Sequence, residues 1–151
     1  MANTMNFDGM DSMHFLVGLL NEFVNRLQTK GDSFFKEISW KQCFLLICIK
    51  LFDKPPAIGE LSGALGTSHQ NVKQMLLKLE KGGYIKLLPD FKDRRKQRVM
   101  ISEKGIAFDR KYAEPSREFM EQLFSGIDTE ELKVTVKTMM KLDSNLKEMQ
   151  E

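Results

Sequence analysis

The stretch IGELSGALGTSHQNVKQMLLKLEKGGYIKLLPDFKDRRKQRVMIS, residues 58–102, decides the fold of this chain. Its first part has apolar residues at helical spacing, and Gly66 interrupts them. Ser68 can then cap a second helix, which carries apolar residues on one face. The opposite face carries polar side chains, Gln70, Lys73 and Gln74. Two helices joined by a tight turn are typical of a helix-turn-helix, whose second helix can enter a DNA major groove.

A basic hairpin follows the second helix. Gly82 and Gly83 are expected to end that helix, because glycine is favoured just after a helix C-terminus. Two short β-prone segments come next, residues 84–88 and 97–101. The loop between them carries four basic side chains, Lys92, Arg94, Arg95 and Lys96. We therefore predict a winged helix, in which a charged hairpin directly follows the recognition helix.

The positive charge of the chain is concentrated in this region, although the whole chain has a formal net charge of only +2. Residues 1–66 hold 6 basic and 7 acidic side chains, for a net charge of −1. Residues 67–111 hold 12 basic and 5 acidic side chains (net +7), and residues 112–151 hold 5 and 9 (net −4). A basic recognition helix and wing would suit a phosphate-binding surface. The alternative is a solvated basic face with no partner.

Helical patterns lie on both sides of the winged helix. Residues 40–52 are apolar almost all round and predict a central core helix. An amphipathic helix before it is expected to end near Lys30-Gly31. Another helix is expected from Ser102 to about residue 124, and Pro115 within it should kink or break it. A last helix begins at a capping box that starts with Asp128.

The fold class we predict is mainly α with a small β-wing (α+β), in a single domain covering residues 1–151. Residues 38–102 would form the DNA-binding lobe, with recognition helix 67–81 and wing 84–102. Residues 10–31 and 103–150 would be dimerisation helices, because one chain cannot easily bury all their apolar faces whereas a two-fold dimer can. The alternative is a monomer whose terminal helices fold back on the core.

This combination of features resembles the MarR (multiple antibiotic resistance regulator) family of bacterial transcription factors. The resemblance rests on IGELSGALGTSHQNV in the helix-turn-helix, LEKGGYI at the end of the recognition helix and DRRKQRVMIS in the wing. The last of these is similar to the family's wing signature, whose positions here are Asp93, Arg95, Ile101, Ser102 and Gly105. The similarity in order and spacing covers nearly the whole chain.

The resemblance implies a homodimer that regulates transcription, more often as a repressor than as an activator. Its two winged helices would read a pseudo-palindromic operator in double-stranded DNA. It also implies that Arg95 enters the minor groove while Asp93 holds it, which suits the chemistry of both side chains. An ordinary surface pair in a hairpin loop is the alternative. Many relatives carry arginine where this chain has Gln74 and Leu87, so no operator sequence can be transferred.

We expect DNA contacts from residues of the recognition helix and the wing. The candidates are Ser68, His69, Gln70, Lys73, Gln74, Lys92, Asp93, Arg94, Arg95 and Lys96. Ser68, Gln70, Lys73 and Gln74 would approach base edges, while Lys92, Arg94 and Lys96 would contact phosphates. His69 could contact a phosphate or a base edge, or could be a surface residue with no role.

Other chemistry finds little support in the sequence. The two histidines and two cysteines do not have the spacing of metal ligands. The sequence also has no nucleophile-base pattern and no phosphate-binding glycine loop. We therefore expect no metal, no cofactor and no enzyme activity. Cys43 and Cys48 would be packing residues, with a thiol-based redox sensor as the alternative. The first residues lack a signal-peptide pattern and no apolar run is long enough to span a membrane, so we expect a cytoplasmic protein.

Two partner questions stay open. The resemblance implies a small-molecule effector bound between the dimerisation helices and the DNA-binding lobe. Ten methionines and 11 phenylalanines could line such a pocket, although the simpler interpretation is that they fill cores. A winged-helix adaptor that binds an acidic protein through the same basic face is the rival to DNA binding.

Overall fold

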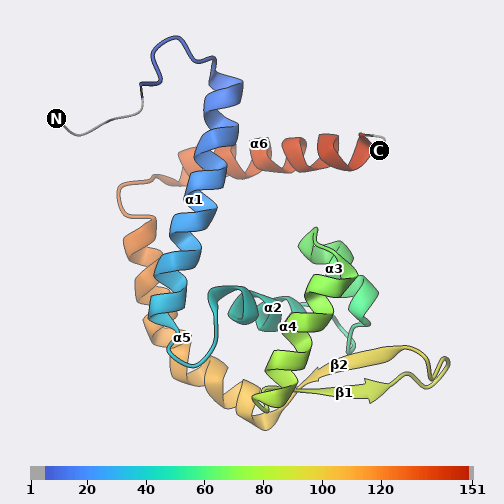
Figure 1. Ribbon diagram of the computed structural model, residues 1–151. Helices are drawn as coiled ribbons and strands as arrows, with labels where there is room; N and C mark the ends of the chain where they lie inside the picture. The colour runs from blue at the N-terminus through green and yellow to red at the C-terminus, as the bar shows by residue number, and fades with distance from the viewer. Residues whose placement is uncertain (1–5, 150–151) are drawn as a thin grey trace. The chain divides into compact units, whose positions relative to one another are not determined.

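The computed structural model describes residues 6–149, which form helices and one small antiparallel sheet (Figure 1). The elements are α1 (Ser12–Phe34), α2 (Trp40–Lys50), α3 (Ile58–Leu65), α4 (His69–Lys81), β1 (Ile85–Pro89), β2 (Gln97–Ile101), α5 (Glu103–Leu123) and α6 (Thr129–Glu148). The predicted fold class, mainly α with a small β-wing, is confirmed. The chain divides into two compact units, the first ending at Ala107 and the second beginning at Phe108.

The first unit is built around α2, which contacts α1, α3, α4 and β2. Ser39 caps this helix: its Oγ accepts from the Gln42 N–H at 3.1 Å, while the Gln42 side chain accepts from the Ser39 N–H at 2.9 Å. The core side chains of α2 are Cys43, Leu45, Leu46, Cys48 and Ile49. One face stays open, because Phe44 and Ile47 keep 51% and 43% of their surface exposed. The expected central core helix is present, but it is not covered on every side.

Helix α1 runs to Phe34, so the prediction that it ends near Lys30-Gly31 is wrong. Gly31 does not end the helix; it is the buried residue of α1 at the place where this helix meets α2. A Cβ on Gly31 would collide with the Trp40 indole ring. Glycine is therefore used here for close helix packing. The Asp32 carboxylate accepts from the Trp40 N–H at 2.7 Å and joins the two helices at this corner.

The helix-turn-helix forms as its sequence predicts. Helix α3 ends at Gly66, which has the left-handed conformation (φ +61°). Ser68 then caps α4, because its Oγ accepts from the Asn71 N–H at 3.2 Å. The apolar faces of the two helices supply fully buried side chains to the core, Leu61, Val72, Leu76 and Leu79. Burial of one face of α4 leaves its polar face to solvent.

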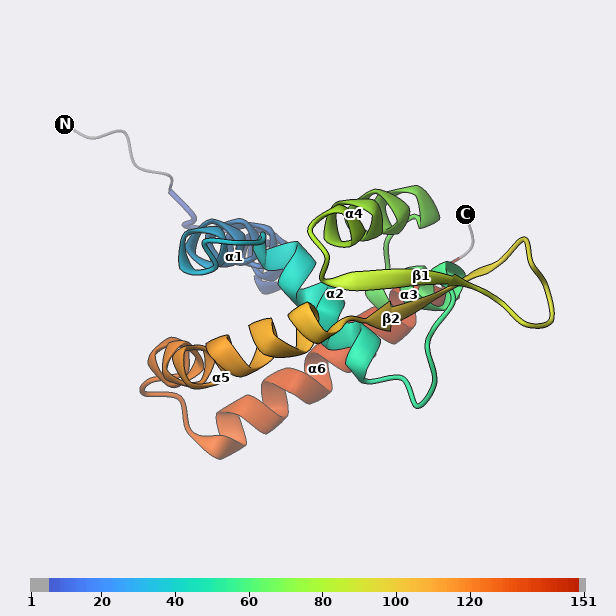
Figure 2. The same cartoon turned by 90° about the horizontal axis from the view of Figure 1, so that it is seen from below.

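The wing consists of β1 and β2, paired antiparallel with Leu87 opposite Val99. Val99 is fully buried, and its N–H donates to the Pro56 carbonyl at 2.9 Å, which connects the hairpin to the segment before α3. An isolated bridge between Ala57 and Arg98 strengthens the same junction. The loop of the hairpin projects beyond α3 and α4 (Figure 2). The predicted wing is confirmed in its strands.

The second unit comprises most of α5 and all of α6. Of the two effects expected of Pro115, a kink or a break, the break does not occur, because α5 continues through this residue. Arg117 pairs with Glu114 across that point and with Glu121 beyond it, although exposed ion pairs of this kind stabilise a helix only slightly. Helix α6 begins with the predicted capping box, in which Asp128 accepts from the Glu131 N–H at 2.8 Å.

No residue of α6 is buried within the chain. Its apolar side chains instead form an exposed stripe that includes Leu132, Val136, Met140 and Leu146. Among the helices of residues 6–149, none has both the length and the apolar character that a membrane crossing needs.

Candidate nucleic-acid interface

The outer face of α4 presents the side chains that the sequence analysis selected for it. Gln70, Lys73 and Gln74 are exposed, while Val72, Leu76 and Leu79 of the same helix are buried. The 3.6-residue period of the helix separates the two sets. Ser68 serves as the N-cap of this helix, so its hydroxyl already accepts one backbone hydrogen bond. Capping fixes where α4 begins and therefore which residues of its first turn face outward.

A depression of about 450 Å³ lies between the start of α3, the start of α4 and the wing. Four of the predicted DNA-contacting residues line it, namely His69 and Lys73 from α4 and Arg95 and Lys96 from the wing. Residues 57–60 at the start of α3, together with Gln97 and Arg98, complete the lining. Folding thus brings together basic side chains that are more than 20 positions apart in the sequence. The depression is a place where a single phosphate could meet several donors.

The other predicted residues are not part of this depression. Gln74 lines a second hollow together with Asn71 and Lys78. Lys92 and Arg94 are exposed on the wing loop and line neither hollow. The candidate residues therefore occupy a recognition-helix face, a basic depression and a projecting loop.

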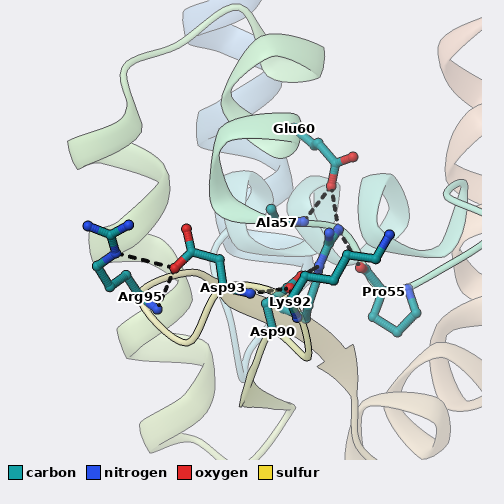
Figure 3. Close-up of polar contacts among 8 residues, drawn as sticks. Pro55, Ala57, Glu60, Asp90, Lys92, Asp93 and Arg95 are labelled. Atoms are coloured by element: carbon teal, nitrogen blue, oxygen red, sulfur yellow. Dashed lines mark hydrogen bonds and ion pairs between the residues drawn. The ribbon is translucent and has the colours of Figure 1, made fainter.

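Asp93 and Arg95 contact each other at the end of the wing (Figure 3). The Asp93 Oδ1 atom accepts from the Arg95 backbone N–H at 3.1 Å and from the Arg95 Nε at 3.3 Å. The Arg95 side chain is 94% exposed, and such a surface ion pair adds little to folding stability. The contact instead restricts the orientation of a guanidinium that projects into solvent.

A network centred on Arg98 anchors the base of the wing. Its Nε donates to Asp90 Oδ2 at 2.6 Å, and its NH1 donates to Glu60 Oε2 at 2.9 Å. Glu60 also accepts from the Ala57 N–H at 2.7 Å, so it caps α3 and holds the wing at once (Figure 3). The sequence alone does not reveal that Arg98 and Glu60 are partners, because 38 positions separate them and no local pattern pairs them.

Asp90 joins this network to the wing loop. Its Oδ1 accepts from the N–H groups of Lys92 and Asp93, at 2.7 Å and 3.0 Å, while its other oxygen holds Arg98. The hydrogen bond from Arg98, assisted by the two backbone N–H groups, lowers the pKa of Asp90 from 3.8 to about 2. The same contact raises the pKa of Arg98. From the sequence alone, Asp90 is recognisable only as a turn-forming residue. Its second role, the ion pair with Arg98, depends on how the hairpin packs.

The Asp90–Arg98 pair predicts a specific acid dependence of stability. The pKa of Asp90 is lower in the folded chain than its ordinary value of 3.8, so its contribution is complete above that pH and is lost as the pH falls through about 2. We expect Asp90→Asn to lower the free energy of unfolding at neutral pH, and we expect the difference from wild type to shrink between pH 3.8 and about 2.

Chemical denaturation at a series of pH values measures this difference. Arg98→Gln is the matched variant, because it removes the partner and leaves the carboxylate in place. The loss of unfolding free energy in this variant, relative to wild type, should disappear over the same pH range. A deficit that stays constant down to the lowest pH would show that the pair does not couple protonation to folding.

The geometry gives little support to the two rival chemistries, thiol-based redox sensing and metal binding. Cys43 and Cys48 are both buried, and burial raises the pKa of the Cys48 thiol, which disfavours the reactive thiolate. Within residues 6–149, no group of three or more His, Cys, Asp or Glu side chains is arranged to hold a metal ion.

The hollow beside Gln74 has a volume of about 490 Å³ and lies in the first unit. It is lined by Trp40, Lys41 and Phe44 of α2, by Met75 and Lys78 of α4, and by Leu65 and Thr67. Its lining combines four aromatic or apolar side chains with five polar or charged ones.

Comparison with known proteins agrees with the sequence and the fold. No family model matches the chain. The transcriptional repressor MprA of Escherichia coli (strain K12) is 35% identical over 92 residues, which are 61% of this chain and 52% of MprA. The chain thus spans about half the length of the curated relatives it matches.

Two solved structures share the fold. A MarR/EmrR family transcriptional regulator from Acinetobacter sp. ADP1 superposes with a TM-score of 0.82 at 18% identity, over 96% of this chain and 100% of that one. The S. aureus MepR–DNA complex gives a TM-score of 0.77 at 19% identity, over 85% and 96%. The resemblance to the MarR family is confirmed, and the chain has the MarR-type winged-helix fold.

Proposed function

We propose that the chain is a homodimeric, sequence-specific DNA-binding regulator of transcription that acts as a repressor in the bacterial cytoplasm. The observation that carries this proposal is the convergence of His69 and Lys73 with Arg95 and Lys96 around one depression between recognition helix and wing. Clustered basic groups beside an exposed polar helix face match what a duplex offers, phosphates on both sides of a groove. Similarity to a transcriptional repressor, MprA, and to MepR, whose structure was solved in complex with DNA, adds support.

In this proposal α4 lies in the major groove. Gln70, Lys73 and Gln74 would reach base edges, and a glutamine can read adenine through two hydrogen bonds. Lys92, Arg94 and Lys96 would contact phosphates and set the register. Arg95, oriented by Asp93, would enter the adjacent minor groove, where narrow width and negative potential favour a guanidinium.

The dimer part of the proposal rests on unburied apolar surface. Helix α6 buries none of its residues within the chain, and α1 leaves Met13, Val17 and Val24 more than half exposed. Soluble chains rarely leave such continuous apolar faces to water unless another surface covers them. A second copy of the chain would cover both helices and would place two recognition helices for a pseudo-palindrome.

The hollow between α2 and α4 supports regulation by a small molecule. A ligand held there by Trp40 and Phe44 would also contact Gln74 and Met75 of the recognition helix. If the ligand binds the free protein more tightly than the DNA-bound protein, it must weaken DNA binding by the same factor. Gln74 and Met75 belong to α4 itself. A small displacement of this helix on ligand binding would therefore move the side chains that read bases.

Selection of duplexes from a random library tests the proposal. We expect the purified protein to recover an inverted repeat with half-sites about one helical turn apart, as a two-fold dimer requires. Affinity for the selected duplex should fall steeply with salt, since each neutralised phosphate contributes roughly −0.9 to the slope of log K against log salt concentration.

The same experiment separates DNA binding from the adaptor alternative. Scrambled duplexes of equal length and composition are the control for sequence preference. An adaptor for an acidic protein would bind selected and scrambled duplexes equally weakly, and that result, obtained with protein stripped of small molecules by refolding, would contradict the proposed function.

A further inference from the structure

The tip of the wing carries an aromatic side chain that the DNA-binding proposal does not use. Phe91 is fully exposed, the most exposed of the large apolar side chains that the structure describes. Ordinary surface phenylalanines keep part of the ring against neighbouring atoms, because water contact with a whole ring is unfavourable. A fully exposed ring on the wing loop therefore indicates a surface that meets something else.

The backbone around Phe91 is held firmly. Asp90, immediately before it, accepts hydrogen bonds from the N–H groups of Lys92 and Asp93, immediately after it. The Asp90 N–H donates to the Lys96 carbonyl at 3.0 Å, and Arg98 fixes the Asp90 carboxylate from the other side. Phe91 thus follows Asp90 directly, in a stretch of backbone that these hydrogen bonds restrain.

The surroundings of Phe91 point to a polyanion. Lys92, Arg94, Arg95 and Lys96 follow it within five positions, and all four are exposed. A ring among so many cations is a poor surface for an apolar protein groove, whereas a nucleic acid offers phosphates for the cations and base stacks for the ring.

We propose that Phe91 is an apolar wedge that enters the minor groove beside Arg95 and partly unstacks one base step, so that the operator bends at each wing. Proteins that bind the minor groove use phenylalanine in this way. Because the cost of unstacking is lowest at pyrimidine–purine steps, the wing would favour a TA or CA/TG step beneath it without hydrogen bonding to those bases. This inference rests on the proposed DNA-binding function.

Three variants of the full-length protein test it. Phe91→Ala removes the wedge, Phe91→Leu keeps an apolar side chain, and Leu88→Ala removes a partly exposed apolar side chain of the same hairpin away from its tip. Each is titrated against the selected duplex carrying 2-aminopurine at successive positions under the wing. Energy transfer between dyes at the duplex ends reports the bend.

For wild type and Leu88→Ala we expect 2-aminopurine fluorescence to rise at one step in each half-site and the ends to approach. Phe91→Ala should lose both signals and bind about tenfold more weakly, by the usual contribution of an aromatic ring stacked on a base. Phe91→Leu should keep the bend in large part. Replacing the favoured step with a GC-rich one should weaken wild type more than Phe91→Ala.

The outcomes separate the wedge from DNA binding itself. If wild type selects no duplex, the proposed function and the wedge fail together. If wild type binds but Phe91→Ala binds and bends the duplex equally well, the wedge alone is wrong. A Phe91→Ala variant that binds more weakly while wild type gives no unstacking signal would reduce Phe91 to a groove contact and would also overturn the wedge.

Discussion

Replacing Arg95 with alanine is expected to weaken binding of the selected operator by about tenfold or more, on the order of 1–3 kcal/mol, the usual size of a groove contact. Its guanidinium projects almost wholly into solvent at the wing tip and is oriented there by Asp93. Because the side chain is 94% exposed and its ion pair with Asp93 lies at the surface, its removal should leave the free energy of unfolding nearly unchanged. Titration of a labelled duplex, with denaturation of the same preparations, measures both quantities.

Two matched variants make this result specific. Arg110→Ala removes an exposed arginine from α5, outside the wing, and should leave affinity unaltered apart from a small charge effect. Arg95→Lys keeps the charge but loses the planar guanidinium that suits a narrow groove, so it should recover only part of the affinity. Equal affinity for wild type and Arg95→Ala would remove Arg95 from the mechanism.

Replacing Leu76 with alanine is expected to lower the free energy of unfolding by about 2–5 kcal/mol, the usual cost of truncating a fully buried leucine. Leu76 has no exposed surface and lies on the inner face of α4, where Val72 and Leu79 flank it. The cavity left behind would lie directly under the recognition helix. Operator affinity should therefore also fall, because α4 loses the packing that sets its position.

Leu77→Ala is the control that the helix itself provides. Leu77 is the next residue along α4, but it keeps 48% of its surface exposed. Surface substitutions of this kind change stability by about 0.5 kcal/mol or less. Similar losses for the two variants, measured by denaturant unfolding, would contradict the placement of Leu76 in the core and Leu77 outside it.

The wing is tied to the rest of the first unit at its base and free at its tip. Arg98 links β2 to Glu60 of α3 and to Asp90, and Asp90 in turn fixes the loop that carries Asp93 and Arg95. A contact that anchors the hairpin therefore also determines where Arg95 points. This coupling explains why an acidic residue, Asp90, lies inside the most basic part of the chain.

The sequence by itself determined the elements and much of the candidate site. Helix spacing, the caps at Ser68 and Asp128 and the glycines after α4 are local signals, because they act through dihedral preferences and hydrogen bonds between near neighbours. The Asp93–Arg95 contact joins residues two positions apart, and the resemblance to the MarR family implies it. Local patterns failed at Gly31, where the helix continues and packs closely on Trp40, and α5 also continues through Pro115 without the break that a proline can cause.

Only the tertiary structure decided which distant groups meet. No periodicity pairs Arg98 with Glu60, or brings His69 and Lys73 to the same depression as Arg95 and Lys96. These contacts arise because α3, α4 and the hairpin pack on α2 at particular angles, and those angles depend on side-chain volumes summed over the whole core. Exposure of Phe91 is decided in the same way, since a phenylalanine in a sequence is equally compatible with a core and with the tip of a wing.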